Sequence, residues 1–226
     1  MFLKIQILAV GFIASLISVV QADDKYSLKT VEQKPPKQVA KSIREKLSNE
    51  SFVVQSEKDK LCTIWFVKNL EVHSKFKPTL SVKYPFQSGQ LIGVIQVSGK
   101  KQFTDFRGQE IATGVFTLRY GKQPEDGNHI GTSDLADFLL ALPAKFDKNP
   151  KTISQLDRLH EQSAKSAGAT HPAIYSLLPA EKKVEQSMTH DADNEFWILN
   201  VNLKTISKGK KRTLPLRVVL FGQSEA

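Results

Sequence analysis

A polar loop between two apolar segments contains the residues of this chain that are best suited to chemistry. The loop runs from Arg119 to Asp134, and Asp126, Asn128 and His129 lie within four residues of one another in it. Carboxylate and amide oxygens are ligands that Ca²⁺ prefers, and imidazole nitrogen is a common ligand of Zn²⁺. Polar loops held between regular elements often carry binding sites. This segment is therefore the first candidate for a functional site.

One interpretation of the loop is a metal site. An EF-hand is excluded, because Ile130 stands at the fifth position of the matching pattern, where that loop needs an oxygen ligand. A looser calcium or zinc site would use Asp126 and His129 as metal ligands. We expect no cofactor, with calcium or zinc at these two residues as the alternative.

Two further interpretations need no metal. In one of them, Asp126 and Asn128 form a tight turn with an Asx-type hydrogen bond. In the other, Arg119, Tyr120 and His129 bind a polar or anionic group directly. Both remain open at the level of sequence.

His171 is the second candidate, because it follows a predicted helix and precedes Pro172, which restricts the backbone. Together with His129 it would supply half of a metal site or a general base. The chain contains no HExxH motif and no G-x-S-x-G motif, so a structural histidine is the alternative. The ligand-binding candidates are Arg119, Tyr120, Asp126, Asn128, His129 and His171.

The densest basic segment is Lys204–Arg212, which contains four lysines and one arginine. The whole chain carries a formal net charge of +9 and has a pI near 9.5, which favours anionic partners such as acidic polysaccharide or a membrane surface. The segment has no aromatic residue for base stacking, so we expect no nucleic-acid partner. A hairpin tip that prevents edge-to-edge aggregation is the alternative role.

The N-terminus has the pattern of a signal peptide. Lys4 precedes an apolar stretch from Ile5 to about Val20, and Ala22 stands directly before two aspartates. We expect cleavage after Ala22, a periplasmic or secreted protein, and no stable membrane anchor after cleavage. The only cysteine, Cys62, lies in an apolar run, which predicts a buried thiol and excludes an intramolecular disulfide.

Short apolar and alternating runs predict a mainly β fold. The predicted strands are Phe52–Gln55, Leu61–Val67, Leu91–Val97, Lys101–Phe106, Val115–Tyr120, Leu135–Leu142, Trp197–Leu203 and Leu214–Leu220. The intervening turns predict antiparallel hairpins between the first and second, the third and fourth, and the last two of these strands. In the Trp197 strand, the alternation predicts that Ile198 and Asn200 face outward.

Two helices are also predicted. Thr152 and Gln155 have the spacing of a capping box, an apolar stripe follows them, and Gly168 stands where a C-terminal cap falls, which predicts a helix near 152–167. A short N-terminal helix is expected near Lys37–Leu47. Short strands with one inserted helix indicate an antiparallel β-sandwich, with a β-barrel as the alternative. The expected organisation is a signal peptide at 1–22, a lead-in with the short helix at 23–50, and a single β-rich domain at 51–226.

Several segments resemble exported hypothetical proteins of unknown function from bacteria such as planctomycetes. The segments that carry this resemblance are Ile64-Trp65-Phe66, Gly114–Gly121, Asp126–Thr132, Phe138–Pro143 and His171-Pro172. The resemblance implies an exported β domain of a Gram-negative type of cell and transfers no catalytic residue.

We therefore expect a non-enzymatic binding or structural module of the cell envelope, in which a β-sandwich presents the loop from Arg119 to Asp134 to an envelope polysaccharide or protein. The alternative is a metal-dependent hydrolase that uses Asp126, His129 and His171, which must converge in one cleft for that chemistry. A third possibility is self-assembly or membrane-surface association through Lys204–Arg212.

Overall fold

The computed structural model describes residues 25–99, 103–123, 135–180 and 183–222. In these residues the chain forms thirteen strands and two helices, which confirms the mainly β fold with one long helix and a short N-terminal helix. The strands are β1 (Ser27–Glu32), β2 (Leu47–Gln55), β3 (Lys60–Val67), β4 (Leu70–Glu71), β5 (Leu91–Val97), β6 (Phe103–Thr104), β7 (Glu110–Ile111), β8 (Gly114–Lys122), β9 (Asp137–Pro143), β10 (Ile174–Leu178), β11 (Ser187–Asp191), β12 (Phe196–Ser207) and β13 (Lys210–Phe221). The helices are α1 (Lys41–Arg44) and α2 (Leu156–Ala167).

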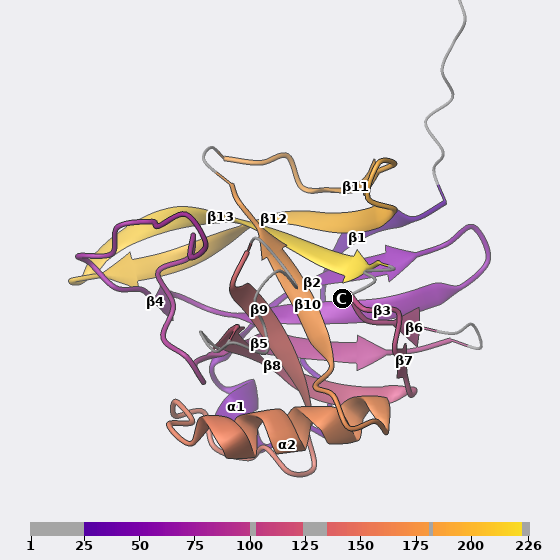
Figure 1. The fold of residues 1–226 in the computed structure, drawn as a ribbon, viewed down its shortest axis with the longest axis horizontal. Coiled ribbons are helices and arrows are strands. Elements are labelled where there is room, and N and C mark those ends of the chain that lie inside the picture. Colours follow the sequence, from indigo (N-terminus) through magenta and orange to yellow (C-terminus); the bar gives the residue numbers. More distant parts are fainter. Residues whose placement is uncertain (1–24, 100–102, 124–134, 181–182, 223–226) are drawn as a thin grey trace, which may run out of the picture.

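Eleven of the strands form one continuous sheet that curls into a half-barrel (Figure 1). The order of its strands is β1-β2-β3-β5-β8-β9-β10-β13-β12-β11, and neighbours in this order are antiparallel. The short strand β4 pairs in parallel with β12 near the β12–β13 turn. The remaining pair, β6 and β7, forms a small separate sheet.

Strand β10 is the corner of the half-barrel. Its first residues, Ile174–Ser176, pair with β9, whereas Leu177 and Leu178 pair with β13. A strand that changes partner along its length allows one array of strands to fold over the other. The main hydrophobic core fills the concave side, and it includes Ile64 from one array and Leu199 from the other.

The convex side of the sheet is also covered, and α2 supplies part of that cover (Figure 1). In β9, Leu139 belongs to the main core, while Leu140 and Leu142 pack against Leu159 of α2. The Ser166 hydroxyl of α2 donates a hydrogen bond of 2.8 Å to the Ala141 carbonyl oxygen. Because both of its faces are buried, β9 is apolar at almost every position instead of alternating.

Two of the three predicted hairpins are confirmed and one is wrong. Strands β2 and β3 pair, as do β12 and β13, which turn at Lys208-Gly209. Strand β5 instead pairs with β3 and β8, and Phe103-Thr104 of the predicted Lys101–Phe106 strand pairs with β7. The partner of β5 is therefore chosen by the core that it shares with β3 and β8, and not by the nearest turn.

The boundaries of α2 differ from the prediction at one end only. Gly168 caps the C-terminus with a left-handed φ of 61°, as expected. At the other end, the N-cap is Gln155 and it makes no side-chain capping bond, so the predicted capping box at Thr152 is wrong. The reason is tertiary: the Ile153 amide donates to the Gly89 carbonyl oxygen at 3.1 Å, which keeps this segment extended.

Two smaller expectations are also corrected. The N-terminal helix is only Lys41–Arg44, and the segment predicted as a lead-in contributes the edge strand β1 and the start of β2. Ile198 and Asn200, predicted to face outward, are 2% and 5% exposed. Ile198 packs in a second cluster with Phe106 on the convex side, so this part of β12 is buried on both faces.

The buried thiol of Cys62 gives a direct test of the core. Cys62 is fully buried in β3, and burial raises the pKa of its thiol. A thiol that is neither exposed nor ionised reacts slowly with thiol reagents. We expect Ellman's reagent at pH 8 to label no thiol in the native protein and one thiol per chain in 6 M guanidinium chloride. Rapid stoichiometric labelling under native conditions would contradict this placement of β3.

Candidate binding site

The central part of the predicted loop lies outside the described residues. Asp126, Asn128 and His129 fall within 124–134, so a metal site at Asp126 and His129 stays a prediction. Within the described ranges, no group of three or more His, Cys, Asp or Glu side chains is arranged to hold a metal ion.

Arg119, predicted to bind a ligand, is completely buried in β8. Its Nε donates to Oδ2 of Asp147 at 2.8 Å, and its Nη2 donates to Oδ1 of the same carboxylate at 2.9 Å. The hydroxyl of Thr117 also donates to Oδ2 of Asp147, at 2.6 Å. Arg119 and Asp147 therefore form a buried bidentate ion pair, the geometry that a planar guanidinium favours.

The remaining Arg119 donors bind backbone carbonyl oxygens. Nη1 donates to Gly89 at 2.9 Å and to Lys151 at 2.7 Å, and Nη2 donates to Asn149 at 2.5 Å. A guanidinium has five N–H groups, and all five are thus used inside the protein. Arg119 fastens the loop after β9 to the loop before β5, and it offers no N–H to a ligand.

Tyr120, the second predicted contact, is also buried. Its hydroxyl donates to Oδ1 of Asp137, and the Lys83 amide donates to Oδ2 of the same carboxylate at 2.5 Å. Burial raises the pKa of Asp137, and these hydrogen bonds partly offset that effect. Burial also raises the pKa of Tyr120. The Asp137 carboxylate thus joins Tyr120 of β8 to the loop before β5, and the tyrosine does not face solvent.

His171 is exposed and lies between α2 and β10. Gln123 and Ala136, on either side of residues 124–134, are hydrogen-bonded to each other beside Asp137 at the start of β9. His171 precedes Ala173, whose carbonyl oxygen accepts from Ala141 near the end of the strand. Asp137 and Ala141 are four residues apart in β9, or about 13 Å at 3.3 Å per residue. His129 lies outside the described residues, so its convergence with His171 stays a prediction.

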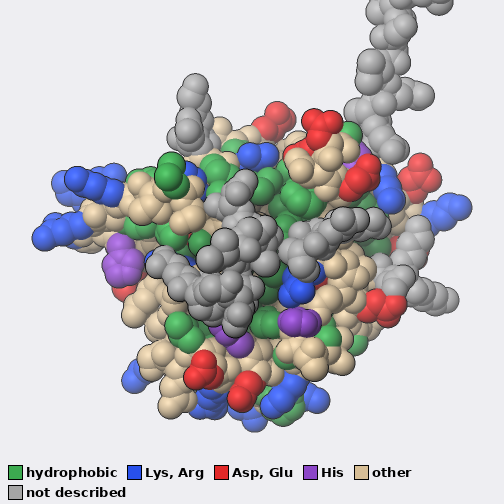
Figure 2. Space-filling view, in the orientation of Figure 1, with side chains coloured by type: hydrophobic (Ala, Val, Ile, Leu, Met, Phe, Trp, Pro, Cys, Tyr) green, Lys and Arg blue, Asp and Glu red, His purple; other side chains and the backbone are tan. Residues whose placement is uncertain are grey.

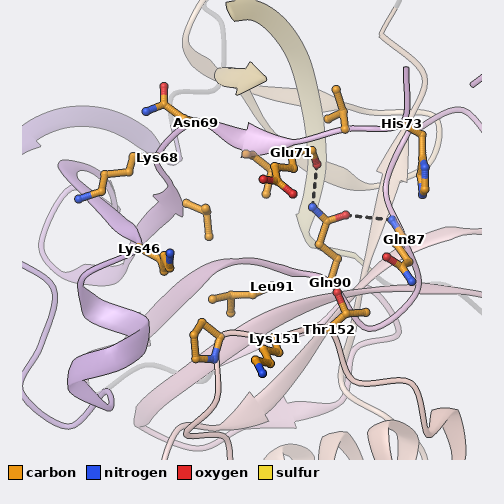
Figure 3. A pocket seen from close by; sticks show the side chains of 14 residues that line it. Lys46, Lys68, Asn69, Glu71, His73, Gln87, Gln90, Leu91, Lys151 and Thr152 are labelled. Carbon is orange, nitrogen blue, oxygen red and sulfur yellow. Dashed lines mark hydrogen bonds between the residues drawn. The ribbon is translucent and has the colours of Figure 1, made fainter. Parts of the chain in front are cut away.

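A cavity of about 570 Å³ lies elsewhere in the described part of the chain. We call it the lysine cavity. It is lined by Lys46, Val67, Lys68, Asn69, Leu70, Glu71, Val72, His73, Gln87, Gln90, Leu91, Pro150, Lys151 and Thr152. Figure 3 shows the side chains that line it, which come mainly from the segment before β2, the β3–β4 turn, β4, the loop before β5 and the loop after β9.

Hydrogen bonds hold the walls of the lysine cavity together. Gln90 donates from Nε2 to the Glu71 carbonyl oxygen at 2.8 Å and accepts from the Gln87 amide at 2.9 Å (Figure 3). The Lys68 amide donates to the Lys46 carbonyl oxygen at 2.9 Å. The site is thus built from backbone and amide contacts that do not use the lysine ammonium groups.

The charge of the lysine cavity is positive. The lining contains three lysines, Lys46, Lys68 and Lys151, and a single carboxylate, Glu71, and all four residues are exposed to solvent. In Figure 3 the Lys68 ammonium group points away from the centre, while Lys46 and Lys151 lie along the cavity's border. Asparagine and glutamine side chains supply donors and acceptors between them. This arrangement suits a polar ligand with a negative charge.

None of the residues that line this cavity was a candidate from sequence. They come from segments between Lys46 and Thr152 that are far apart in the chain, and their lysines are indistinguishable from the lysines spread over the rest of it. Sequence reasoning selected Arg119, which does not line the cavity. Its guanidinium supports the cavity wall by donating hydrogen bonds to the carbonyl oxygens of Lys151 and Gly89. The segment Gln87-Ser88-Gly89-Gln90 carries a local signal, and by itself it indicates a turn.

The predicted basic segment forms the tip of the β12–β13 hairpin. Lys and Arg side chains gather at this protruding end (Figure 2), where Lys204, Lys208, Lys210, Lys211 and Arg212 are all exposed. The tip lies outside the lining of the lysine cavity.

The fold and the cavity thus define a mainly β half-barrel with a basic, amide-rich depression at one end of its sheet. Comparison with protein-family models, with curated proteins and with solved structures finds no match for the chain. Neither α1 nor α2 has the length and apolar character required to cross a lipid bilayer.

Proposed function

We propose that this protein is a non-enzymatic binding module of the cell envelope, and that the lysine cavity holds an acidic sugar. The observation that carries the proposal is the concentration of Lys46, Lys68 and Lys151 with only one carboxylate in a cavity of about 570 Å³. Cavities of roughly 300–1,000 Å³ are typical of small-ligand sites. The export of the protein, to the periplasm or beyond the cell, rests on the signal-like pattern of residues 1–22.

The chemistry of the lining favours a hydroxylated anion over a simple ion. The side-chain amides of Asn69 and Gln87 can both donate and accept hydrogen bonds, as sugar hydroxyl groups require, and lysine ammonium groups can bind a carboxylate. Because the ammonium groups are exposed to solvent, each contributes modestly and is screened by salt. We expect weak binding that decreases as ionic strength rises.

The proposal is tested by isothermal titration calorimetry of the purified protein with galacturonic acid. Lys151→Ala should weaken binding by about five- to tenfold, because hydrogen bonds to charged groups are worth about 1.5–3 kcal/mol before screening reduces them. Lys208→Ala at the hairpin tip removes the same charge outside the cavity, and it should change affinity less than twofold. Equal losses in the two variants would show that net charge alone attracts the sugar, and the cavity would not be the site.

A further inference from the structure

A second cavity adjoins the lysine cavity and shares part of its wall. It has a volume of about 290 Å³ and lies between the loop after β9 and the start of α2. Its lining includes Lys148, Lys151, Ser154, Gln155, Arg158 and Gln162. Lys151 and Thr152 line both cavities, so the two depressions meet at these residues.

The second cavity is also basic. Lys148 and Arg158 join the shared Lys151, and the carboxylate of Asp147 is already compensated by Arg119. Beside it, the ammonium groups of Lys145 and Lys165 lie 4.8 and 5.5 Å from the centre of the Phe146 ring. Positive charge therefore continues from the lysine cavity across Lys151 to the start of α2.

The shared wall has a fixed position. The Lys151 carbonyl oxygen accepts from Arg119, and the Lys151 amide donates to Oδ1 of Asn149 at 3.0 Å. Two residues later, the Ile153 amide donates to the Gly89 carbonyl oxygen. The buried guanidinium therefore sets how the two cavities lie relative to each other, which preorganises them for a ligand that spans both.

We propose that the two cavities are adjacent subsites for one acidic oligosaccharide, with Lys151 between consecutive uronic acid units. This inference rests on the proposed function and extends it from a single sugar to a chain. The side chains of Ser154, Gln155 and Gln162 supply hydroxyl and amide groups in the second cavity, as the amides do in the first. An acidic peptide would provide carboxylates for the lysines but no array of hydroxyl groups for these partners.

The test compares galacturonic acid with its dimer and tetramer by isothermal titration calorimetry at 150 mM salt. A ligand that engages two linked subsites binds more tightly than its monomer, because the second contact is intramolecular. We expect the tetramer to bind at least tenfold more tightly than the monomer.

Two variants separate the subsites. Arg158→Ala should weaken binding of the tetramer at least fivefold and leave the affinity for the monomer within twofold, whereas Lys46→Ala should weaken binding of both ligands. Lys208→Ala is the matched control, and circular dichroism verifies that each exposed substitution leaves the fold intact.

Each contrary outcome identifies what has failed. Equal affinities for monomer and tetramer, or no effect of Arg158→Ala, would overturn the second subsite while the proposed function stood. The absence of binding by every galacturonide would overturn both proposals. If a tetra-glutamate peptide bound as tightly as the tetramer, with the same dependence on Arg158, the saccharide assignment would be replaced by an acidic peptide.

Discussion

Asp147→Asn is expected to lower the free energy of unfolding by about 3–5 kcal/mol, because it leaves the buried guanidinium of Arg119 without its counter-charge. The ion pair is 0% and 3% exposed at its two side chains, so water does not compensate for the loss. The amide retains one oxygen, but its –NH₂ group cannot accept from either the guanidinium or Thr117.

Urea unfolding followed by circular dichroism measures this effect. Asp193→Asn is the control, because Asp193 is exposed in the turn between β11 and β12, and such a change is expected to fall within about 0.5 kcal/mol of the wild type. The substitution at Asp147 should also weaken sugar binding, since Asn149 and Lys151 depend on the Arg119 side chain that it disturbs. A loss of stability below about 1 kcal/mol would contradict the central role of the pair.

Gly89→Ala is expected to destabilise the protein by roughly 2–5 kcal/mol, through backbone strain and overpacking together. Gly89 has a φ of +80°, and an added Cβ would lie 1.8 Å from the carbonyl oxygen of Ile153. That atom is backbone, so it cannot move aside as the end of a side chain would. The segment that carries Lys151 and Thr152 would have to shift, and the lysine cavity with it.

Gly209→Ala separates the two contributions. Gly209 has a similar φ of +73°, but nothing lies within 4 Å of an added Cβ. Its substitution therefore reports the strain of a left-handed backbone alone, about 1 kcal/mol. Thermal and urea unfolding of the two variants should differ by at least 1 kcal/mol. Equal losses would mean that Gly89 and Ile153 are not in close contact.

Elements defined by neighbouring residues were predicted well from sequence. The β2–β3 and β12–β13 hairpins, the C-terminal end of α2 at Gly168 and the burial of Cys62 all follow from local patterns of apolar and turn residues. These patterns extend over only a few residues, so they can be recognised in the sequence alone.

The candidate site was not predicted, because no local pattern encodes it. In the sequence, nothing distinguishes Lys46, Lys68 and Lys151 from other surface lysines. They line one cavity only because the fold places the start of β2, the end of β3 and the loop after β9 side by side. Arg119 was interpreted as a ligand contact because it borders a polar loop, but its environment depends on Asp147, which is 28 residues away in the chain. A charged side chain changes role with burial, and burial is a property of the folded chain.

By itself, then, the sequence determined a mainly β chain with the longer strands β2, β3, β5, β8, β9, β12 and β13, the end of its helix and an excess of positive charge. Tertiary structure alone decided that β5 pairs with β3 and β8, that α2 begins after Gln155 because Ile153 is bound to Gly89, and that Arg119 supports a cavity. The physical reason is the range of the interactions. Periodicity and turns are local, whereas strand pairing, burial of charge and convergence of side chains arise from contacts between residues distant in the chain.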